Sequence, residues 1–297
     1  MSRPRQAPSG VELVLDAHAE LGEGPIWDAA ASRLIWVDIL RGRVYRFDPA
    51  SGRAETRDIG RPVGVAVPSA DGSIVIATTR GFERLEWASG RVSTIAEVEA
   101  DRPGNRMNDG ACDPAGRFWA GTMALDESPG AGTLYRLDPD GRVSPMVRDI
   151  SISNGIAWSA DARRMFYVDS STQRIDVFDY DVATGAIANR RTLVRIAPGH
   201  GVPDGLIVDA DGFIWLALWS GSTLHRYAPD GTLDRVVALP ASYPTKCAFG
   251  GTALDELFIT TATIALTRAR RAVQPHDGGL LRIRPGVRGC AAYIFGG

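Results

Sequence analysis

The sequence predicts an all-β protein, a six-bladed β-propeller of four-stranded blades, and three observations support this prediction. An apolar run recurs six times, its central residues lie 40 to 48 residues apart, and turn residues separate the strands on either side of it. Spacings of about 40 to 50 residues are typical of propeller blades. The six runs are Leu34–Asp38, Ile74–Thr78, Arg117–Gly121, Met165–Asp169, Phe213–Ala217 and Leu257–Thr261.

Two further strand patterns recur with each of these runs, one before it and one after it. A short strand precedes each run and begins with a small residue, as at Gly155 and Gly205, and an alternating strand follows it, as at Val44–Asp48. Turns such as Asp138–Gly141 separate them, because glycine accepts positive φ and proline and aspartate favour the preceding turn positions. A polar fourth strand such as Arg142–Val147 completes a blade.

The sixth repeat shows no fourth strand, whereas Val11–Leu15 is a spare strand at the amino end. We therefore expect the N-terminal strand to join the last blade and close the ring, which leaves few exposed sheet edges. Residues 1–10 are expected to be a flexible segment and residues 11–297 a single propeller domain. The segment Thr263–His276 is interpreted as a loop at the rim of the propeller.

Composition excludes several classes of protein. The 297 residues include 33 Lys and Arg against 35 Asp and Glu, so the net charge of −2 gives no indication of a basic surface for nucleic acid, although local patches are compatible with it. The sequence has no window of 18 to 20 uninterrupted apolar residues, so it predicts no membrane span. Three scattered cysteines favour a reducing, cytoplasmic location over a disulfide framework. The expected partner is a small molecule, and a closed ring that needs no second subunit predicts a monomer.

Residues that precede the inner strands should converge on the central channel of a propeller. They are Glu23, Val63, Asp109 with Asn108, Asn154, Asp204 and Lys246. Glu23, Asn154 and Asp204 are oxygen donors, which suits one divalent cation such as Ca²⁺, Mg²⁺ or Mn²⁺, with Zn²⁺ possible as a second choice. The alternative interpretation is a ring of polar residues hydrated by ordered water.

Several motifs in combination resemble the SMP30/gluconolactonase/regucalcin-like sugar lactonases, which are six-bladed propellers. The motifs are Gly22–Pro25, Asn105–Gly110, Phe118–Met123, Ser153–Gly155, Pro203–Gly205 and Phe249–Gly251. The resemblance implies a single divalent ion held by Glu23, Asn154 and Asp204. It also implies that Arg106 and Asn108 bind the sugar. Asp126 occupies the position of an acidic residue of the family, and we expect it to contact substrate hydroxyls.

The resulting hypothesis is divalent-metal-dependent hydrolysis of an aldonolactone, such as gluconolactone, to the aldonic acid. A bound ion would polarise the carbonyl while Asp204 accepts a proton from the attacking water, with a hydroxide on the ion as the rival base. Two alternatives are a metal-dependent hydrolase of the phosphotriesterase type and a non-catalytic calcium-binding propeller. A polar channel mouth would favour the lactonase, and an apolar mouth would favour the phosphotriesterase.

Other residues receive less specific interpretations. Asp38 and Asp169 end matching strands and are expected to be structural hydrogen-bond acceptors. Lys246, the single lysine of the chain, is expected to contact the substrate or a neighbouring carboxylate. Trp219 is the aromatic residue most suited to face a sugar. The remaining strand tryptophans, which are expected to pack between blades, are Trp27, Trp36, Trp119, Trp158 and Trp215.

Overall fold

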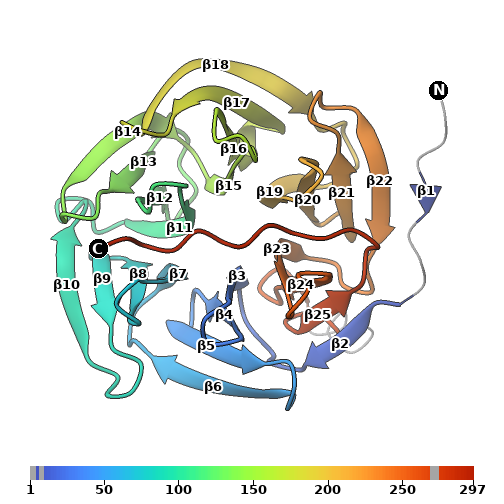
Figure 1. The fold of residues 1–297 in the computed structure, drawn as a ribbon, viewed down its shortest axis with the longest axis horizontal. Coiled ribbons are helices and arrows are strands. Elements are labelled where there is room, and N and C mark those ends of the chain that lie inside the picture. Colours follow the sequence, from blue (N-terminus) through green and yellow to red (C-terminus); the bar gives the residue numbers. More distant parts are fainter. Residues whose placement is uncertain (1–4, 7–9, 268–273) are drawn as a thin grey trace.

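The computed structural model describes residues 5–6, 10–267 and 274–297, which form a six-bladed β-propeller (Figure 1). The six sheets stand around a central channel, and the first strand of each blade lies nearest to it. The predicted fold class is therefore confirmed. In the described residues the one helical element is the three-residue 3₁₀ turn η1 (Ser170–Thr172), and no helix there is long and apolar enough to cross a membrane.

Each blade contains four consecutive strands, except that the last blade takes one strand from the amino end. The first blade contains β3 (Gly22–Asp28), β4 (Arg33–Asp38), β5 (Arg43–Asp48) and β6 (Arg53–Asp58). The second contains β7 (Val63–Pro68), β8 (Ile74–Thr78), β9 (Gly81–Leu85) and β10 (Val92–Glu97). The third contains β11 (Asn105–Cys112), β12 (Phe118–Ala124), β13 (Gly132–Leu137) and β14 (Val143–Ile150). The fourth blade contains β15 (Ser153–Trp158), β16 (Arg164–Asp169), β17 (Arg174–Asp181) and β18 (Ala186–Arg195). The fifth contains β19 (Val202–Val208), β20 (Ile214–Trp219), β21 (Thr223–Tyr227) and β22 (Leu233–Ala238). The sixth contains β23 (Pro244–Gly250), β24 (Glu256–Thr261), β25 (Leu280–Ile283) and β2 (Glu12–Leu15).

The strand β2 closes the ring as expected. It pairs antiparallel with β25, with Leu13 opposite Leu281, and so supplies the missing fourth strand of the last blade. A second short strand, β1 (Arg5–Gln6), adds to the edge of the fifth blade by pairing parallel with β22. The rest of the predicted flexible segment, except Gly10, lies outside the described residues, as does the middle of the predicted rim loop Thr263–His276.

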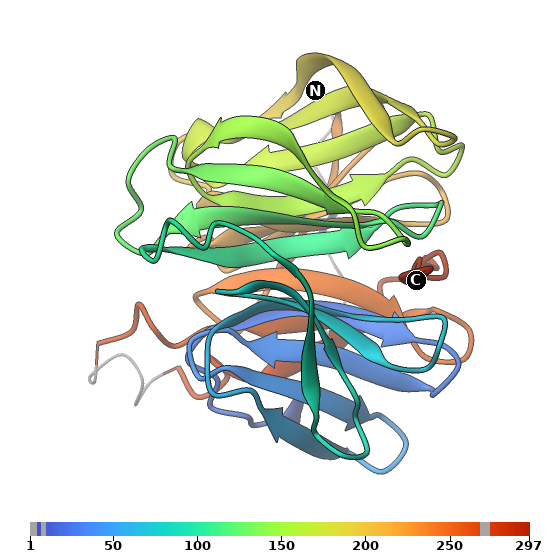
Figure 2. The same cartoon turned by 90° about the vertical axis from the view of Figure 1, so that its left-hand side faces the viewer.

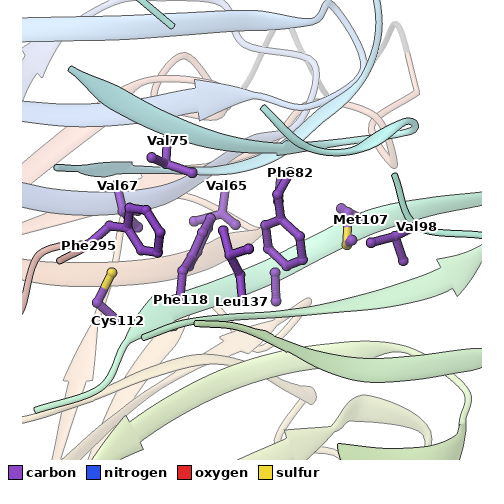
Figure 3. Packing of buried hydrophobic residues seen from close by; sticks show 12 residues of the cluster. Val65, Val67, Val75, Phe82, Val98, Met107, Cys112, Phe118, Leu137 and Phe295 are labelled. Atoms are coloured by element: carbon purple, nitrogen blue, oxygen red, sulfur yellow. The ribbon is translucent and has the colours of Figure 1, made fainter. Parts of the chain in front are cut away.

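The hydrophobic core lies between neighbouring blades, because the two innermost strands of each blade are buried on both faces. Figure 3 shows one such interface, in which Val65 and Phe82 of the second blade meet Phe118 and Leu137 of the third. The rings of Phe82 and Phe118 meet edge to face with their centroids 5.3 Å apart. The predicted inter-blade tryptophans are all buried, as their strand patterns indicate.

The carboxyl-terminal segment makes a second, unpredicted link across the ring. After β25 the chain crosses one face of the propeller to the side opposite the last blade (Figure 1). There the N–H of Phe295 donates to the carbonyl of Pro68 at 2.9 Å, and the Phe295 ring enters the core between the second and third blades. Figure 2 shows this segment on one face and residues 262–267, which follow β24, on the other.

Candidate active site in the central channel

A cavity of about 310 Å³ lies in the channel, and its lining includes Ile264 of the segment that follows β24. Its floor contains buried polar side chains together with the buried apolar residues Met123 and Pro203, and its rim consists of partly or strongly exposed residues. The polar floor contains Glu23, Arg106, Asn108, Asn154, Ser170 and Asp204. Residues from four different blades therefore meet in one site, as the repeat predicted.

The start of each inner strand explains how these side chains reach the channel. All six inner strands show a register shift against the second strand of their blade, and it falls at or directly beside the predicted site positions. In β3 the shift lies between Glu23 and Ile26, and in β19 it lies between Pro203 and Leu206. An irregularity of this kind bends the strand and changes the direction of its side chains. The repeated shift is consistent with side chains that point into the channel.

Small residues allow the inner strands to approach one another. A Cβ atom at Gly155 would lie 2.6 Å from the backbone nitrogen of Leu206, so only glycine fits between the fourth and fifth blades there. At Gly205 the position of a Cβ is taken by the alkyl chain of Lys246. The glycine that follows Asp204 thus opens the path by which the Lys246 side chain enters the channel.

Two buried carboxylates hold the loops that lead into the site. The side chain of Asp38 accepts hydrogen bonds from the N–H groups of Glu20 and Leu21, at 2.8 and 3.1 Å. Asp169 accepts equivalent bonds from Ser151 and Ile152. The structural role predicted for both aspartates is confirmed, and it fixes the backbone immediately before Glu23 and Asn154.

A chain of hydrogen bonds sets the orientation of the amide groups. The Ser170 hydroxyl donates to the carbonyl of Pro203 at 2.7 Å, so it accepts a bond from Asn154 Nδ2 at 2.8 Å. Asn154 Oδ1 is then directed away from Ser170, and Asn108 Nδ2 donates to it at 3.1 Å. Asn108 Oδ1 in turn accepts from the Arg106 guanidinium at 2.6 Å. Asn154 therefore presents an oxygen to the floor.

Lys246 forms a buried ion pair across the channel. It comes from β23 of the sixth blade, and its Nζ lies 2.5 Å from Oδ1 of Asp109 on β11 of the third blade, directly opposite in the ring. Both side chains are almost fully buried, and Lys246 also donates to the carbonyl of Gly110 at 3.2 Å. Lys246 lines a separate, apolar cavity toward the carboxyl-terminal segment. We therefore interpret the pair as a partition of the channel below the polar floor.

The surroundings of Glu23 and Asp204 at the floor disfavour the charged forms of their carboxyl groups. Burial, together with the nearby Asp109 carboxylate, raises the pKa of Glu23 to about 8. Burial also raises the pKa of Asp204 well above its usual range, and the charges of Glu23 and Asp109 add to this shift while Lys246 opposes it. The single ammonium group of Lys246 is therefore insufficient compensation for these carboxyl groups.

The residues of the floor fit a divalent cation. Asp204 Oδ1 and Asp109 Oδ2 are buried with no hydrogen-bond partner in the described part of the chain, which is costly for a carboxylate oxygen. An oxygen-ligated cation would lower the pKa of these acids and stabilise their charge. No group of three Asp, Glu, His or Cys residues in the described ranges could hold an ion, so a cation here would need a further ligand such as the amide oxygen of Asn154, which lines the same cavity.

The sixth predicted site residue, Asp126, does not line this cavity. Its carboxylate is exposed and accepts a hydrogen bond from the N–H of Ser128 at 3.0 Å, which stabilises the turn after β12. The next residue, Glu127, lines the cavity instead, and its charge acts on the Arg106 guanidinium. The sequence Asp126–Glu127–Ser128 contained a signal for this, because an aspartate two residues before a serine commonly forms such a turn.

Trp219 lines the rim, where its ring centroid lies 4.8 Å from that of Tyr243. Ser170 is a site residue that the sequence did not reveal. Its only signal was its position directly after Asp169, where the chain turns away from the second strand of the fourth blade.

The fold and the channel site together define a six-bladed propeller with an acidic, oxygen-rich site at one mouth of its channel. A family model described as SMP-30/Gluconolactonase/LRE-like region matches residues 21–263, and the chain belongs to this family. Regucalcin from Gallus gallus is 38% identical over 97% of this chain and 98% of its own.

Two solved structures show the same architecture. A calcium-binding regucalcin from Agrobacterium tumefaciens matches with a TM-score of 0.94 and 29% identity, covering 98% of each chain. A luciferin-regenerating enzyme matches with a TM-score of 0.91 and 32% identity, covering 97% of this chain and 99% of its own. These similarities extend over essentially the whole propeller, including the strands that carry the site.

Proposed function

We propose that this protein hydrolyses a lactone to the corresponding hydroxy acid, with one divalent cation at the channel floor. The observation that carries the proposal is the floor itself, where Oδ1 of Asp204, which has no hydrogen-bond partner among the described residues, lies in one cavity with the Glu23 carboxylate, the Asn154 amide and the Arg106 guanidinium. The family description, which names gluconolactonase, supports a lactonase-type activity.

The cation would be held by Glu23, Asn154 and Asp204, and when bound it would supply Lewis-acid polarisation of the ester. Asp204 would accept a proton from the attacking water. Arg106, a buried guanidinium whose charge persists because its pKa is lowered only to about 10, would hold the carboxylate of the product. In the reaction the water oxygen bonds to the carbonyl carbon, the ring C–O bond breaks, and a proton passes to the ring oxygen.

A pH-stat assay of lactones tests this proposal. The panel begins with aldonolactones such as gluconolactone, and rates are measured for the protein as purified, after chelation, and after each divalent cation is restored. We expect a rate above spontaneous ring opening that chelation abolishes and one cation restores. An absence of metal-dependent hydrolysis on every lactone would refute the proposal.

Variants at Asp204 separate the role of ligand from the role of base. Asp204→Asn keeps an oxygen that can bind a cation but cannot accept a proton, and Asp204→Ala removes both functions. We expect Asp204→Asn to retain a measurable part of the metal content while losing about 10² to 10⁴ in rate. Full activity with metal still bound would assign the base to another group.

The rim of the cavity favours a second candidate, a hydrolase of phosphotriesters. Exposed apolar side chains, including Leu125 and Ile264, surround the mouth. An apolar mouth suits the alkyl or aryl groups of such esters, whereas the polar floor suits a lactone and its product carboxylate. An aryl dialkyl phosphate in the same assay distinguishes the two activities, because only one of them releases a phenol.

A further inference from the structure

The site cavity has two chemically different zones. Its floor is polar and buried, whereas its rim contains Leu21, Leu40, Leu125, Ile152, Val202, Trp219, Ile264 and Glu127. Among the described residues of this rim, the polar side-chain groups are the Glu127 carboxylate and the indole N–H of Trp219. A ligand that reaches from the floor to the rim therefore passes from a polar to an apolar surrounding.

Two rim residues are unusual for this protein. In the described part of the chain five large apolar side chains are strongly exposed, and Leu125 and Ile264, at 56% and 45%, are the most exposed of them. Scattered apolar residues on a surface are common, but a cluster around a cavity marks a binding site. These two residues lie on different blades, in the turn after β12 and in the segment after β24.

Backbone hydrogen bonds hold both residues in place. The N–H of Leu125 donates to the carbonyl of Gly104 at 2.8 Å, and that of Ile264 donates to the carbonyl of Glu20 at 3.0 Å. Trp219 completes the apolar surface, and its ring is supported by Tyr243. The backbone of the rim is thus held at Leu125 and Ile264, and their apolar side chains are exposed.

We propose that the site takes lactones whose ring bears an apolar alkyl or aryl substituent. This inference rests on the proposed lactonase function and narrows its substrate class. The ester of such a lactone lies on the polar floor, and its substituent lies against Leu125, Ile264 and Trp219. The hydroxyl groups of an aldonolactone would instead lie against a mostly apolar rim, where among the described residues only the Glu127 carboxylate and the Trp219 indole offer them hydrogen bonds, which is unfavourable when water is excluded.

Three δ-lactones with the same ring test the proposal. They are δ-valerolactone, which has no substituent, δ-decalactone, which has a five-carbon chain, and δ-gluconolactone, which has hydroxyl groups. We expect kcat/KM for δ-decalactone to exceed the value for each of the others by at least about tenfold, because a single methylene in an apolar pocket is worth roughly that much. A value for δ-gluconolactone equal to or above that for δ-decalactone would overturn the inference and leave the lactonase function intact.

Binding of the products gives a readout that does not depend on turnover. Calorimetric titration compares 5-hydroxydecanoate with gluconate, the products of the substituted and hydroxylated lactones. We expect 5-hydroxydecanoate to bind at least about tenfold more tightly, and equal or weaker binding would contradict the inference. If no lactone is hydrolysed but this preference is found, the proposed function fails and the apolar specificity of the site stands.

Variants of the rim identify the residues responsible. We expect the double variant Leu125→Ser with Ile264→Ser to lower the ratio of kcat/KM for δ-decalactone over δ-valerolactone at least fivefold. Val182→Ser is the matched control, because Val182 is 41% exposed and lies between β17 and β18, away from the cavity lining. A ratio that changes equally in the control and the rim variant would show that these side chains do not contact the substituent.

Discussion

At the scale of single residues, the ion pair between Lys246 and Asp109 is a direct contact across the channel. Both partners are buried, and they come from opposite blades of the ring. Removing one partner of a buried pair leaves an uncompensated charge, which commonly costs about 3–5 kcal/mol. The pair therefore contributes to the channel both as a link across the ring and as a compensation for its acids.

We expect Lys246→Met to lower the free energy of unfolding by about 3–5 kcal/mol, because methionine fills the alkyl volume but leaves the Asp109 carboxylate unpaired. Chemical denaturation of Lys246→Met, Asp109→Asn and the double variant measures the coupling. We expect the double variant to be more stable than Lys246→Met alone. Additive losses in the two single variants would show that the pair is not coupled.

His225 makes the stability of the protein depend on pH. Burial lowers the pKa of this histidine to about 4, and the charge of His200 acts in the same direction. Between about pH 4 and the usual value of 6.5, the unfolded chain binds a proton here that the folded protein does not. Stability from this group is thus complete above pH 6.5 and is lost as the pH falls through that window.

We expect the wild type to lose more thermal stability than His225→Asn between pH 7.5 and pH 4.5. Asparagine has an oxygen that accepts a hydrogen bond from Tyr227, the partner of His225 Nδ1 at 2.9 Å, but it does not titrate in this range. The expected difference in the Tm loss is on the order of 2–4 °C. Parallel curves for the two proteins would contradict a buried neutral histidine.

At the scale of elements, the sequence predicted the channel residues well because a repeat links sequence position to spatial position. The positions of Glu23, Asn154 and Asp204 are equivalent in their blades, so their convergence in one cavity follows from the blade period alone. The place of Asp126 depends instead on a single turn of the chain. In that turn the residue that lines the cavity is Glu127, one position later than predicted, whereas Asp126 is exposed to solvent.

The carboxyl-terminal segment could not be predicted in this way, because it has no strand pattern and its contacts are distant in sequence. Phe295 packs among residues of the second and third blades (Figure 3), more than 150 positions away along the chain. Nothing in the local sequence distinguishes this buried phenylalanine from an exposed one. Its position depends on the completed ring, which supplies the hydrophobic surface that it covers.

We expect Phe295→Ala to lower the free energy of unfolding by about 3–5 kcal/mol, since the ring is 1% exposed and its removal leaves a cavity between two blades. Tyr293→Ala is the control, because Tyr293 belongs to the same segment but is 40% exposed. Urea denaturation compares the two variants with the wild type. Equal, small losses in both would show that the segment contributes little to stability.

At the scale of the whole molecule, the fold is a closed ring whose ends are joined by noncovalent contacts. The strand β2 is the amino-terminal contribution to the last blade, and the register of Leu13 with Leu281 places it at the outer edge of that sheet. Leu13 packs on the core between the fifth and sixth blades, and Leu15 packs on the core between the sixth and first. One short strand therefore supports two interfaces.

Deletion of residues 1–15 tests how far the ring depends on this closure. It removes β2, breaks the ion pair between Glu12 and Arg282, and exposes the edge of β25 together with apolar surface on both sides of the last blade. Deletion of residues 1–9 is the matched control, because it removes β1 but keeps β2. We expect the shorter deletion to change the Tm by no more than a few degrees, and the longer one to lower it by more than about 10 °C, with aggregation through the exposed edge. Similar melting curves for the two deletions would show that the other contacts between the first and last blades suffice to hold the ring.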